Sequence, residues 1–388
     1  MTCRTLIVTQ KLNYINPTWS LLVEELAKRA DVTVIGWGYG KNYSDYRTVT
    51  RELGHFDVAI VDPWVVGPSR PYLEESRPAG ILDVGIPTFI NLMVQDLHTL
   101  GEDFFRGYID RCSFAISIVG SPQFWKRSFA ESYPREHWLK PGYVTERPEV
   151  IDERFLLFPH AVGDGEFHAV ARQRPIDISI AGTSYWFRSR AAEIIKDAAG
   201  LKVKSQATLI ERAAARLAVN SRPARRLGAI PIAQFLFRRT LRRSLSSITC
   251  DGSVGYPIRK FFEIPAAGSI LIARPFEQPE ALGFRHRDTA VLVGDADLHT
   301  LGDIVRWLKS DSVESRALAT RGQDMVRSFH NVSRRVDQIL QAAAAAAAGK
   351  LTGMRWRDAN PILSLSDGSD GFHATDKDLA DRLLTHRK

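Results

Sequence analysis

The sequence predicts an α/β protein with two doubly wound domains, each a mostly parallel sheet covered by helices on both faces. Short apolar runs rich in β-branched residues alternate with helical segments along the chain. The alternation restarts after the polar segment RQRPID, near residue 170. A chain of 388 residues that is 44% hydrophobic and 25% charged also suits two ordinary cores. We expect domains over residues 1–170 and 171–345, followed by a mobile tail over 346–388.

The first half contains five expected strands before residue 120, each ending at polar, Gly or Pro residues. They cover residues 5–8, 32–35, 58–61, 89–94 and 114–119. Between the first two strands, residues 19–29 carry apolar side chains at helical spacing, which completes a βαβ unit. A further short strand and a Gly-containing linker follow within residues 155–169.

The second half repeats this order of strands and helices. Its expected strands lie within residues 176–182, 246–252, 270–273 and 289–295. Its expected helices cover residues 187–198, 259–267, 298–308, 313–329 and 332–348. Beyond the alanine run the chain is rich in Gly, Ser and Asp without a sustained apolar period, as is typical of a tail with at most a short terminal helix.

The composition argues for a cytoplasmic protein with reduced cysteines. No stretch approaches the roughly 20 apolar residues that span a bilayer, and the first residues lack a long apolar signal core. Cys3, Cys112 and Cys250 are odd in number, far apart, and without metal-ligand spacing. We expect all three to be free thiols.

A formal charge of +8 favours acidic partners such as a nucleotide diphosphate, an anionic membrane or nucleic acid. Residues 212–243 contain many arginines and no acidic residue. Within them, FLFRRTLRR at 235–243 suits either an amphipathic helix peripheral to the inner face of a membrane or a solvated outer helix face. The chain has no zinc spacing, recognition helix or aromatic sheet signature, which argues against nucleic acid.

Candidate ligand-binding residues follow the strands of the second half, because open parallel sheets bind ligands beyond the carboxyl ends of their strands. Backbone N–H groups at a helix start and nearby cations suit a diphosphate, and a carboxylate one turn later can accept hydrogen bonds from ribose hydroxyls. Each residue alone is also typical of a solvated surface or a helix cap. The candidates are Gly182, Thr183, Arg188, Tyr256, Arg259, Lys260 and Glu263.

Two long motifs resemble a known family. RKFFEIPAAGSILIARPFEQPEALGFRHRDTAVLVGDADLHTLGDIVRWLKSD, followed by ATRGQDMVRSFHNVSRRVDQIL, resembles the C-terminal signature of GT-B glycosyltransferases. It is most similar to the spore-maturation-protein-like branch of the group 1 transferases, and SIAGTSYWFRSR resembles the strand-to-helix start of that branch. The resemblance covers roughly residues 176–340.

The resemblance implies two Rossmann-like domains that face each other across a cleft. A nucleotide-diphosphate sugar would bind to the second domain, and a glycan, lipid-linked or other hydroxyl acceptor to the first, as in polysaccharide biosynthesis. Glu263 matches the carboxylate that grips the ribose, Arg259 the basic residue of the same motif, and Gly182 and Arg188 the phosphate-side turn. The second carboxylate of the wider group is missing before Glu263. No metal is expected, because basic side chains and a helix start neutralise the leaving diphosphate.

Asp96 and His98, in the QDLH segment after an expected strand, are our candidates for the catalytic base. A helix cap and a surface histidine explain them equally well. His160, in FPHAVG, is a secondary candidate for the cleft, and hinge packing is its alternative explanation.

Two other functions fit the same residues. A sugar-nucleotide epimerase would use the donor without an acceptor, and a non-catalytic module would only bind a nucleotide or glycan. Retention and inversion of the anomeric configuration both stay open.

Overall fold

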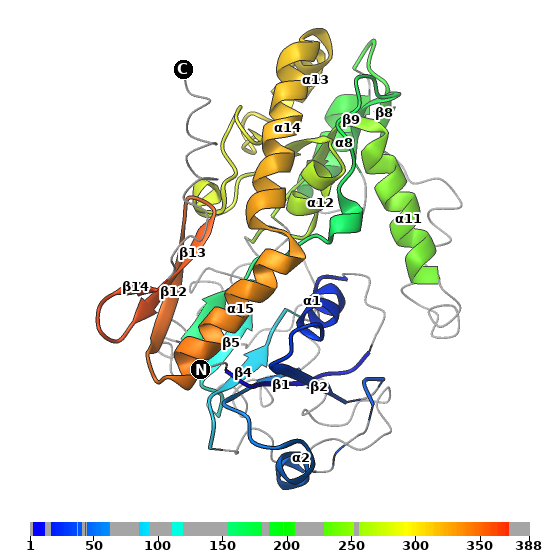
Figure 1. Ribbon diagram of the computed structural model, residues 1–388. Coiled ribbons are helices and arrows are strands. Elements are labelled where there is room, and N and C mark those ends of the chain that lie inside the picture. Colours follow the sequence, from blue (N-terminus) through cyan, green and yellow to red (C-terminus); the bar gives the residue numbers. More distant parts are fainter. Residues whose placement is uncertain are drawn as a thin grey trace.

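The computed structural model describes residues 3–11, 17–36, 38–40, 43, 45–62, 85–93, 111–118, 154–180, 186–196, 198–205, 229–251 and 256–371. These residues form two lobes, one above the other in Figure 1, each built around a parallel sheet. The GT-B fold expected from the sequence is confirmed.

The first sheet has six parallel strands in the order β2-β1-β3-β4-β5-β6. Their bounds are β1 (Thr5–Val8), β2 (Val32–Ile35), β3 (Val58–Val61), β4 (Thr88–Asn91), β5 (Phe114–Ser117) and β6 (Phe155–Leu157). Each strand lies where an apolar run predicted it, because strands buried on both faces need continuous apolar sequence.

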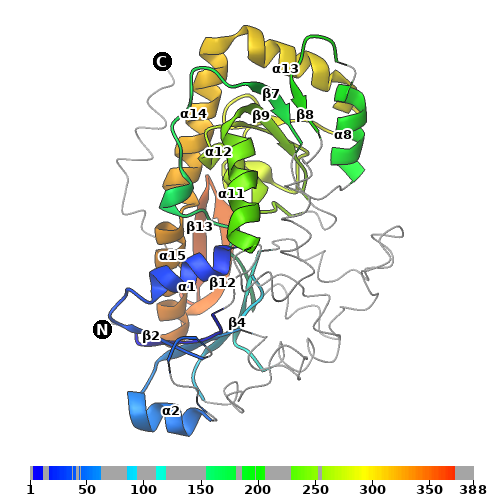
Figure 2. The ribbon, with the colours of Figure 1, turned by 90° about the vertical axis from the view of Figure 1, so that its right-hand side faces the viewer.

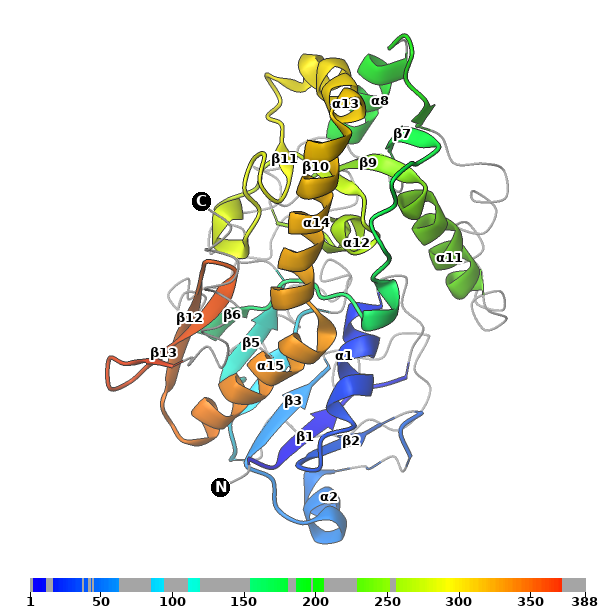
Figure 3. The same ribbon diagram turned by 45° about the horizontal axis from the view of Figure 1, so that its top comes forward.

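Helices cover both faces of the first sheet. Leu6 and Val8 pack with α2 (Tyr46–Leu53), whereas Ile7 faces α1 (Thr18–Leu26). The same face is covered by α15 (Val332–Ala347), which returns from the second lobe and crosses the sheet beside α1 (Figure 3). The C-terminal helix of the chain therefore contributes to the core of the first lobe.

The second sheet has five parallel strands in the order β11-β10-β9-β7-β8. Their bounds are β7 (Ile176–Ser179), β8 (Val203–Lys204), β9 (Ser244–Thr249), β10 (Ile270–Ala273) and β11 (Val291–Leu292). Its helices are α8 (Trp186–Lys196), α11 (Ala229–Arg242), α12 (Lys260–Ala266), α13 (Leu301–Ser310) and α14 (Ser312–Phe329). α8 and α13 cover one face, and α12 and α14 cover the other (Figure 2).

Two chain crossings connect the lobes, and they are hydrogen-bonded to each other. The first is the linker 158–175, which contains the short 3-10 helix η2 (Asp164–Glu166), and the second is the junction of α14 and α15. Val162 N donates to His330 O at 3.0 Å, and Val332 N donates to Val162 O at 3.0 Å. Asn331 caps α15 at this junction by accepting from Arg334 N.

A third sheet corrects the expectation of a tail from residue 346. Residues 351–371 form antiparallel strands β12 (Leu351–Arg357), β13 (Asn360–Leu365) and β14 (Asp370–Gly371). Asp358 and Ala359 make the two-residue turn between β12 and β13 with φ of 50° and 61°. Such turns favour Asn-Gly or Asp-Gly, so an Asp-Ala turn gives little sequence signal. Residues 372–388 lie outside the described part of the chain.

Trp356 attaches this third sheet to the first lobe. Its indole Nε1 donates to Leu157 O at 2.8 Å, at the end of β6. Its ring also lies under the guanidinium of Arg335 at 4.9 Å and stacks on His330. The antiparallel sheet therefore packs where α14 passes into α15.

All three cysteines are free thiols, with Cys112 and Cys250 buried, which confirms the expectation for them. Among the described helices, none combines the length and apolar character needed to cross a bilayer.

Gly322 of α14 approaches the loop before β11 so closely that a Cβ built on it would lie 2.6 Å from Thr289 O. We predict that Gly322→Ala lowers the free energy of unfolding by about 1–3 kcal/mol, because the packed loop must move. Gly302→Ala in α13 is a matched control, since its Cβ would meet nothing closer than Arg306 Nη1 at 3.5 Å. Urea unfolding measures both variants, and equal stability of Gly322→Ala and wild type contradicts the packing.

Candidate active site

The candidate residues gather at the switch point of the second sheet, where the chain passes from β8 back across β7 to β9. Ligands of doubly wound sheets bind at such points, beyond the carboxyl ends of the strands. α8 follows β7 and α12 follows β9, so both helices begin at this edge. Their first turns bring Arg188 and Lys260 together.

Lys260 is a partly buried cation close to a second cation. Its ammonium lies 5.6 Å from the centre of the Phe237 ring of α11 and forms no hydrogen bond or ion pair with the described residues. Burial and the nearby charge of Arg188 lower the pKa of Lys260 to about 8. Arg188 itself is buried, with 1% of its surface exposed.

Glu263 lies one turn further along α12. Its Oε1 accepts from Arg259 Nη1, and its Oε2 accepts no hydrogen bond from any residue that the structure describes. Its side chain is 14% exposed. One oxygen of this carboxylate is therefore held, and the other remains available to a ligand.

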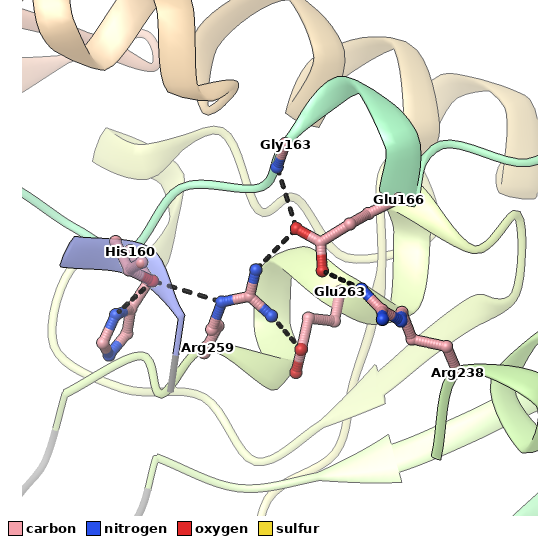
Figure 4. A network of polar contacts seen from close by, with 7 residues as sticks. His160, Gly163, Glu166, Arg238, Arg259 and Glu263 are labelled. Carbon is pink, nitrogen blue, oxygen red and sulfur yellow. Dashed lines mark hydrogen bonds and ion pairs between the residues drawn. The ribbon is translucent and has the colours of Figure 1, made fainter. Parts of the chain in front are cut away.

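Arg259, one of the predicted donor-binding residues, donates to three acceptors within the protein. Nε donates to Thr18 Oγ1 at 3.1 Å, Nη2 donates to Glu166 Oε2 at 2.6 Å, and Nη1 donates to Glu263 (Figure 4). The guanidinium is 6% exposed. Every nitrogen of this side chain is thus engaged within the protein.

Glu166 of η2 is the second carboxylate of this network. Besides Arg259, Gly163 N donates to its Oε2 at 2.8 Å, and Arg238 of α11 donates to its Oε1 at 3.3 Å (Figure 4). Burial favours the neutral acid, but Arg259, the hydrogen bonds and Arg238 together lower the pKa of Glu166. Burial likewise opposes the charge of Arg259, and Glu263 and Glu166 outweigh it and raise the pKa of Arg259.

His160 is buried, with 1% of its surface exposed, and belongs to the same polar network. Its Nδ1 lies 3.2 Å from Thr18 Oγ1. Thr18 Oγ1 also accepts from Arg259 Nε, and the tautomer of the His160 ring decides which of the two groups donates in the contact between Thr18 and His160. Burial, Arg259 and Arg335 lower the pKa of His160 to about 3. A neutral histidine held in this way fits the hinge-packing interpretation.

Tyr256 stands before α12 and packs, partly buried, against the core of the first lobe. Its backbone N–H donates to Asp251 O at 3.2 Å. The other predicted site residues, Asp96, His98, Gly182 and Thr183, lie outside the described residues.

Sequence reasoning missed Thr18 and Glu166. Thr18 begins α1 after a proline, and Glu166 follows Gly163 in a short GDGE segment. Both patterns are common at helix starts, so neither identifies a partner for Arg259.

Sequence motif and fold agree with known glycosyltransferases. Residues 167–341 match a protein family described as glycosyl transferase-like. An α-glucosyltransferase solved in complex with UDP-glucose and DNA containing an abasic site has a TM-score of 0.53 and 12% identity, covering 89% of this chain and 100% of that one. Residues 167–341 are thus glycosyl transferase-like in sequence, and the chain has the GT-B fold.

Two further solved structures are less similar to this chain. A sucrose-phosphate synthase from Thermosynechococcus elongatus has a TM-score of 0.48 and 13% identity, over 89% of this chain and 100% of the other. Anabaena Alr3699/HepE in complex with UDP and glucose has a TM-score of 0.45 and 11% identity, over 88% and 99%. No curated protein matches the sequence.

Acid should destabilise the folded enzyme through His160. The folded state keeps this histidine neutral down to about pH 3, whereas the unfolded chain binds a proton near 6.5, so stability falls as pH falls from about 6.5 to 3. We predict that His160→Asn, whose amide can either donate to or accept from Thr18, reduces this slope by up to about 1.4 kcal/mol per pH unit. Urea unfolding between pH 7.5 and 5 measures it, and an unchanged slope contradicts the buried neutral histidine.

Proposed function

We propose that this chain is a glycosyltransferase that takes a sugar from a nucleotide-diphosphate donor on the second lobe and transfers it to a hydroxyl of a glycan or lipid-linked acceptor on the first. The observation that supports the proposal is the pair of neighbouring cations, Lys260 and Arg188, at the switch point of the second sheet. We also assign the chain to the spore-maturation-protein-like branch, on the RKFFEIPAAG and SIAGTSYWFRSR motifs.

The two cations suit a diphosphate because like charges held together repel until an anion lies between them. Burial adds to this repulsion, since it removes the water that would screen the charges. A leaving nucleoside diphosphate gains negative charge during transfer, so fixed cations stabilise the transition state more than the ground state. We propose that this pair makes a divalent metal unnecessary.

We propose that Glu263 binds the ribose of the donor. Its Oε2 has no hydrogen-bond donor among the described residues, and a carboxylate oxygen can accept from two vicinal hydroxyls. The position one turn before Glu263 holds Arg259, so this position has no second carboxylate that could contact the sugar. Asp96 and His98 remain our candidates for the base that deprotonates the acceptor hydroxyl.

Donor binding tests this function. We predict that Lys260→Met weakens the binding of the donor about tenfold to hundredfold, because a charge-assisted contact to phosphate is lost. Glu263→Gln should weaken it by a similar factor through the ribose. Calorimetry against a panel of nucleotide-diphosphate sugars gives the dissociation constants, and UDP sugars come first because the structurally similar α-glucosyltransferase binds UDP-glucose.

Arg190→Met is the matched control for Lys260→Met. Arg190 is a neighbouring cation of α8 that pairs with Glu193 and is 58% exposed, and its replacement should leave binding unchanged. The pKa of Lys260 is about 8 in the protein without donor, so the side chain loses its positive charge above about pH 8. The affinity of the wild type for the donor should then fall by up to tenfold per pH unit, and Lys260→Met should not show this pH dependence. No binding by wild type, or equal binding by both α12 variants and wild type, contradicts the proposal.

We propose that the outer face of α11 contacts an anionic membrane. Ile232 and Phe235 are each 54% exposed, Arg239 of the same helix is also exposed, and the exposed Arg243 follows the last residue of the helix. Spacings of three and four residues keep Ile232, Phe235 and Arg239 in one stripe of α11. Apolar side chains can enter the headgroup region while the arginines attract acidic lipid, which gains about 1 kcal/mol per basic residue.

Vesicle binding tests this surface. We predict that the wild type sediments with vesicles rich in phosphatidylglycerol at low salt, and neither with pure phosphatidylcholine nor at high salt. Phe235→Ser should reduce binding severalfold, whereas Val313→Ser, at an 80% exposed apolar position of α14, should not. Failure to bind acidic vesicles, or equal loss in both variants, would overturn the membrane contact.

A further inference from the structure

We propose that Arg259 is a positioning residue that couples the contact between the two lobes to the orientation of Glu263. The inference rests on the proposed function, in which Glu263 binds the ribose of the donor. Arg259 belongs to the second lobe but donates to three different places: α1 of the first lobe, the linker and α12. It is the geometry of this side chain that connects them.

The guanidinium is a rigid planar fork, so the directions of its N–H groups are fixed relative to one another. When Nε points to Thr18 and Nη2 points to Glu166, the direction of Nη1 follows. That direction is where Glu263 accepts its hydrogen bond. The position of Thr18 therefore contributes to the position of the Glu263 carboxylate.

Glu166 is the fixed point of this arrangement. Three donors hold it, from Arg259 at 2.6 Å, Gly163 at 2.8 Å and Arg238 at 3.3 Å. Two of these donors lie outside α12, so the carboxylate stays in place if Arg259 turns. The hydrogen bond from Arg259 Nε to Thr18 Oγ1 then decides how the guanidinium is rotated about its contact with Glu166.

Thr18 is the part of the network that the first lobe supplies. It is the first residue of α1 and is 1% exposed, and its hydroxyl oxygen accepts from Arg259 Nε and lies 3.2 Å from His160 Nδ1. When the lobes move apart, Nε loses this acceptor and the fork is free to turn. Glu263 would then lose the support that directs it to the ribose.

A double-mutant cycle on donor binding tests this coupling. We expect Thr18→Val, which keeps the shape of the side chain but removes its hydroxyl, to weaken donor binding about fivefold to thirtyfold. Thr18→Ser, which keeps the hydroxyl, should bind nearly as wild type. In the Glu263→Gln background, Thr18→Val should have no further effect, because its influence passes through Glu263. Calorimetry measures all five proteins.

The outcomes separate this inference from the proposed function. Wild-type affinity in Thr18→Val, or an equal loss of affinity in both backgrounds, overturns the positioning role, since a structural role would lower stability without depending on Glu263. Wild-type affinity in Glu263→Gln overturns the ribose contact, and the positioning role with it. If Thr18→Val does not fold, Arg259→Lys keeps the charge without the fork, and wild-type donor affinity there overturns the inference.

Discussion

The arrangement of the two lobes depends on the burial of one guanidinium group. Taking an arginine out of water costs several kcal/mol unless its charge is neutralised and its N–H groups find acceptors. Arg259 meets both conditions only when the linker, α12 and α1 supply Glu166, Glu263 and Thr18 together. Arg238 balances the second carboxylate, so two arginines face two glutamates in this network.

Arg259 and Lys260 are neighbours in the sequence, but the geometry of the helix gives their charges different surroundings. Successive side chains of a helix point about 100° apart, so Arg259 and Lys260 at the start of α12 face different surroundings. Arg259 faces the linker and the first lobe, where carboxylates neutralise it. Lys260 faces α11 and α8, where Phe237 and Arg188 leave its charge uncompensated except by Glu263. Lys260, which has no hydrogen-bonded acid among the described residues, is the cation suited to an incoming anion.

Local sequence patterns were sufficient to predict the strands and helices but not to predict which charged residues of the site pair with each other. β1, β2, β3 and β10 have the bounds expected from their apolar runs, because burial on both faces leaves a continuous signal. The Arg259–Glu166 pair joins residues 93 positions apart, and no local pattern indicates which cation a distant carboxylate will neutralise. The hairpin of β12 and β13 was missed for another reason, since Asp358 and Ala359 adopt positive φ without a glycine.

The hinge and the contact between the lobes are parts of one short segment. Val162 exchanges backbone hydrogen bonds with the α14–α15 junction, so the two crossings form a paired connection that limits the lobes mainly to rotation about it. His160 lies two residues before Val162 and touches Thr18, and Glu166 lies four residues after it and holds Arg259. A rotation at the hinge would move Thr18, which belongs to the first lobe, relative to the guanidinium of Arg259. Glu166 is held by Gly163 of the linker and by Arg238 of the second lobe, so its contact with Arg259 would change less.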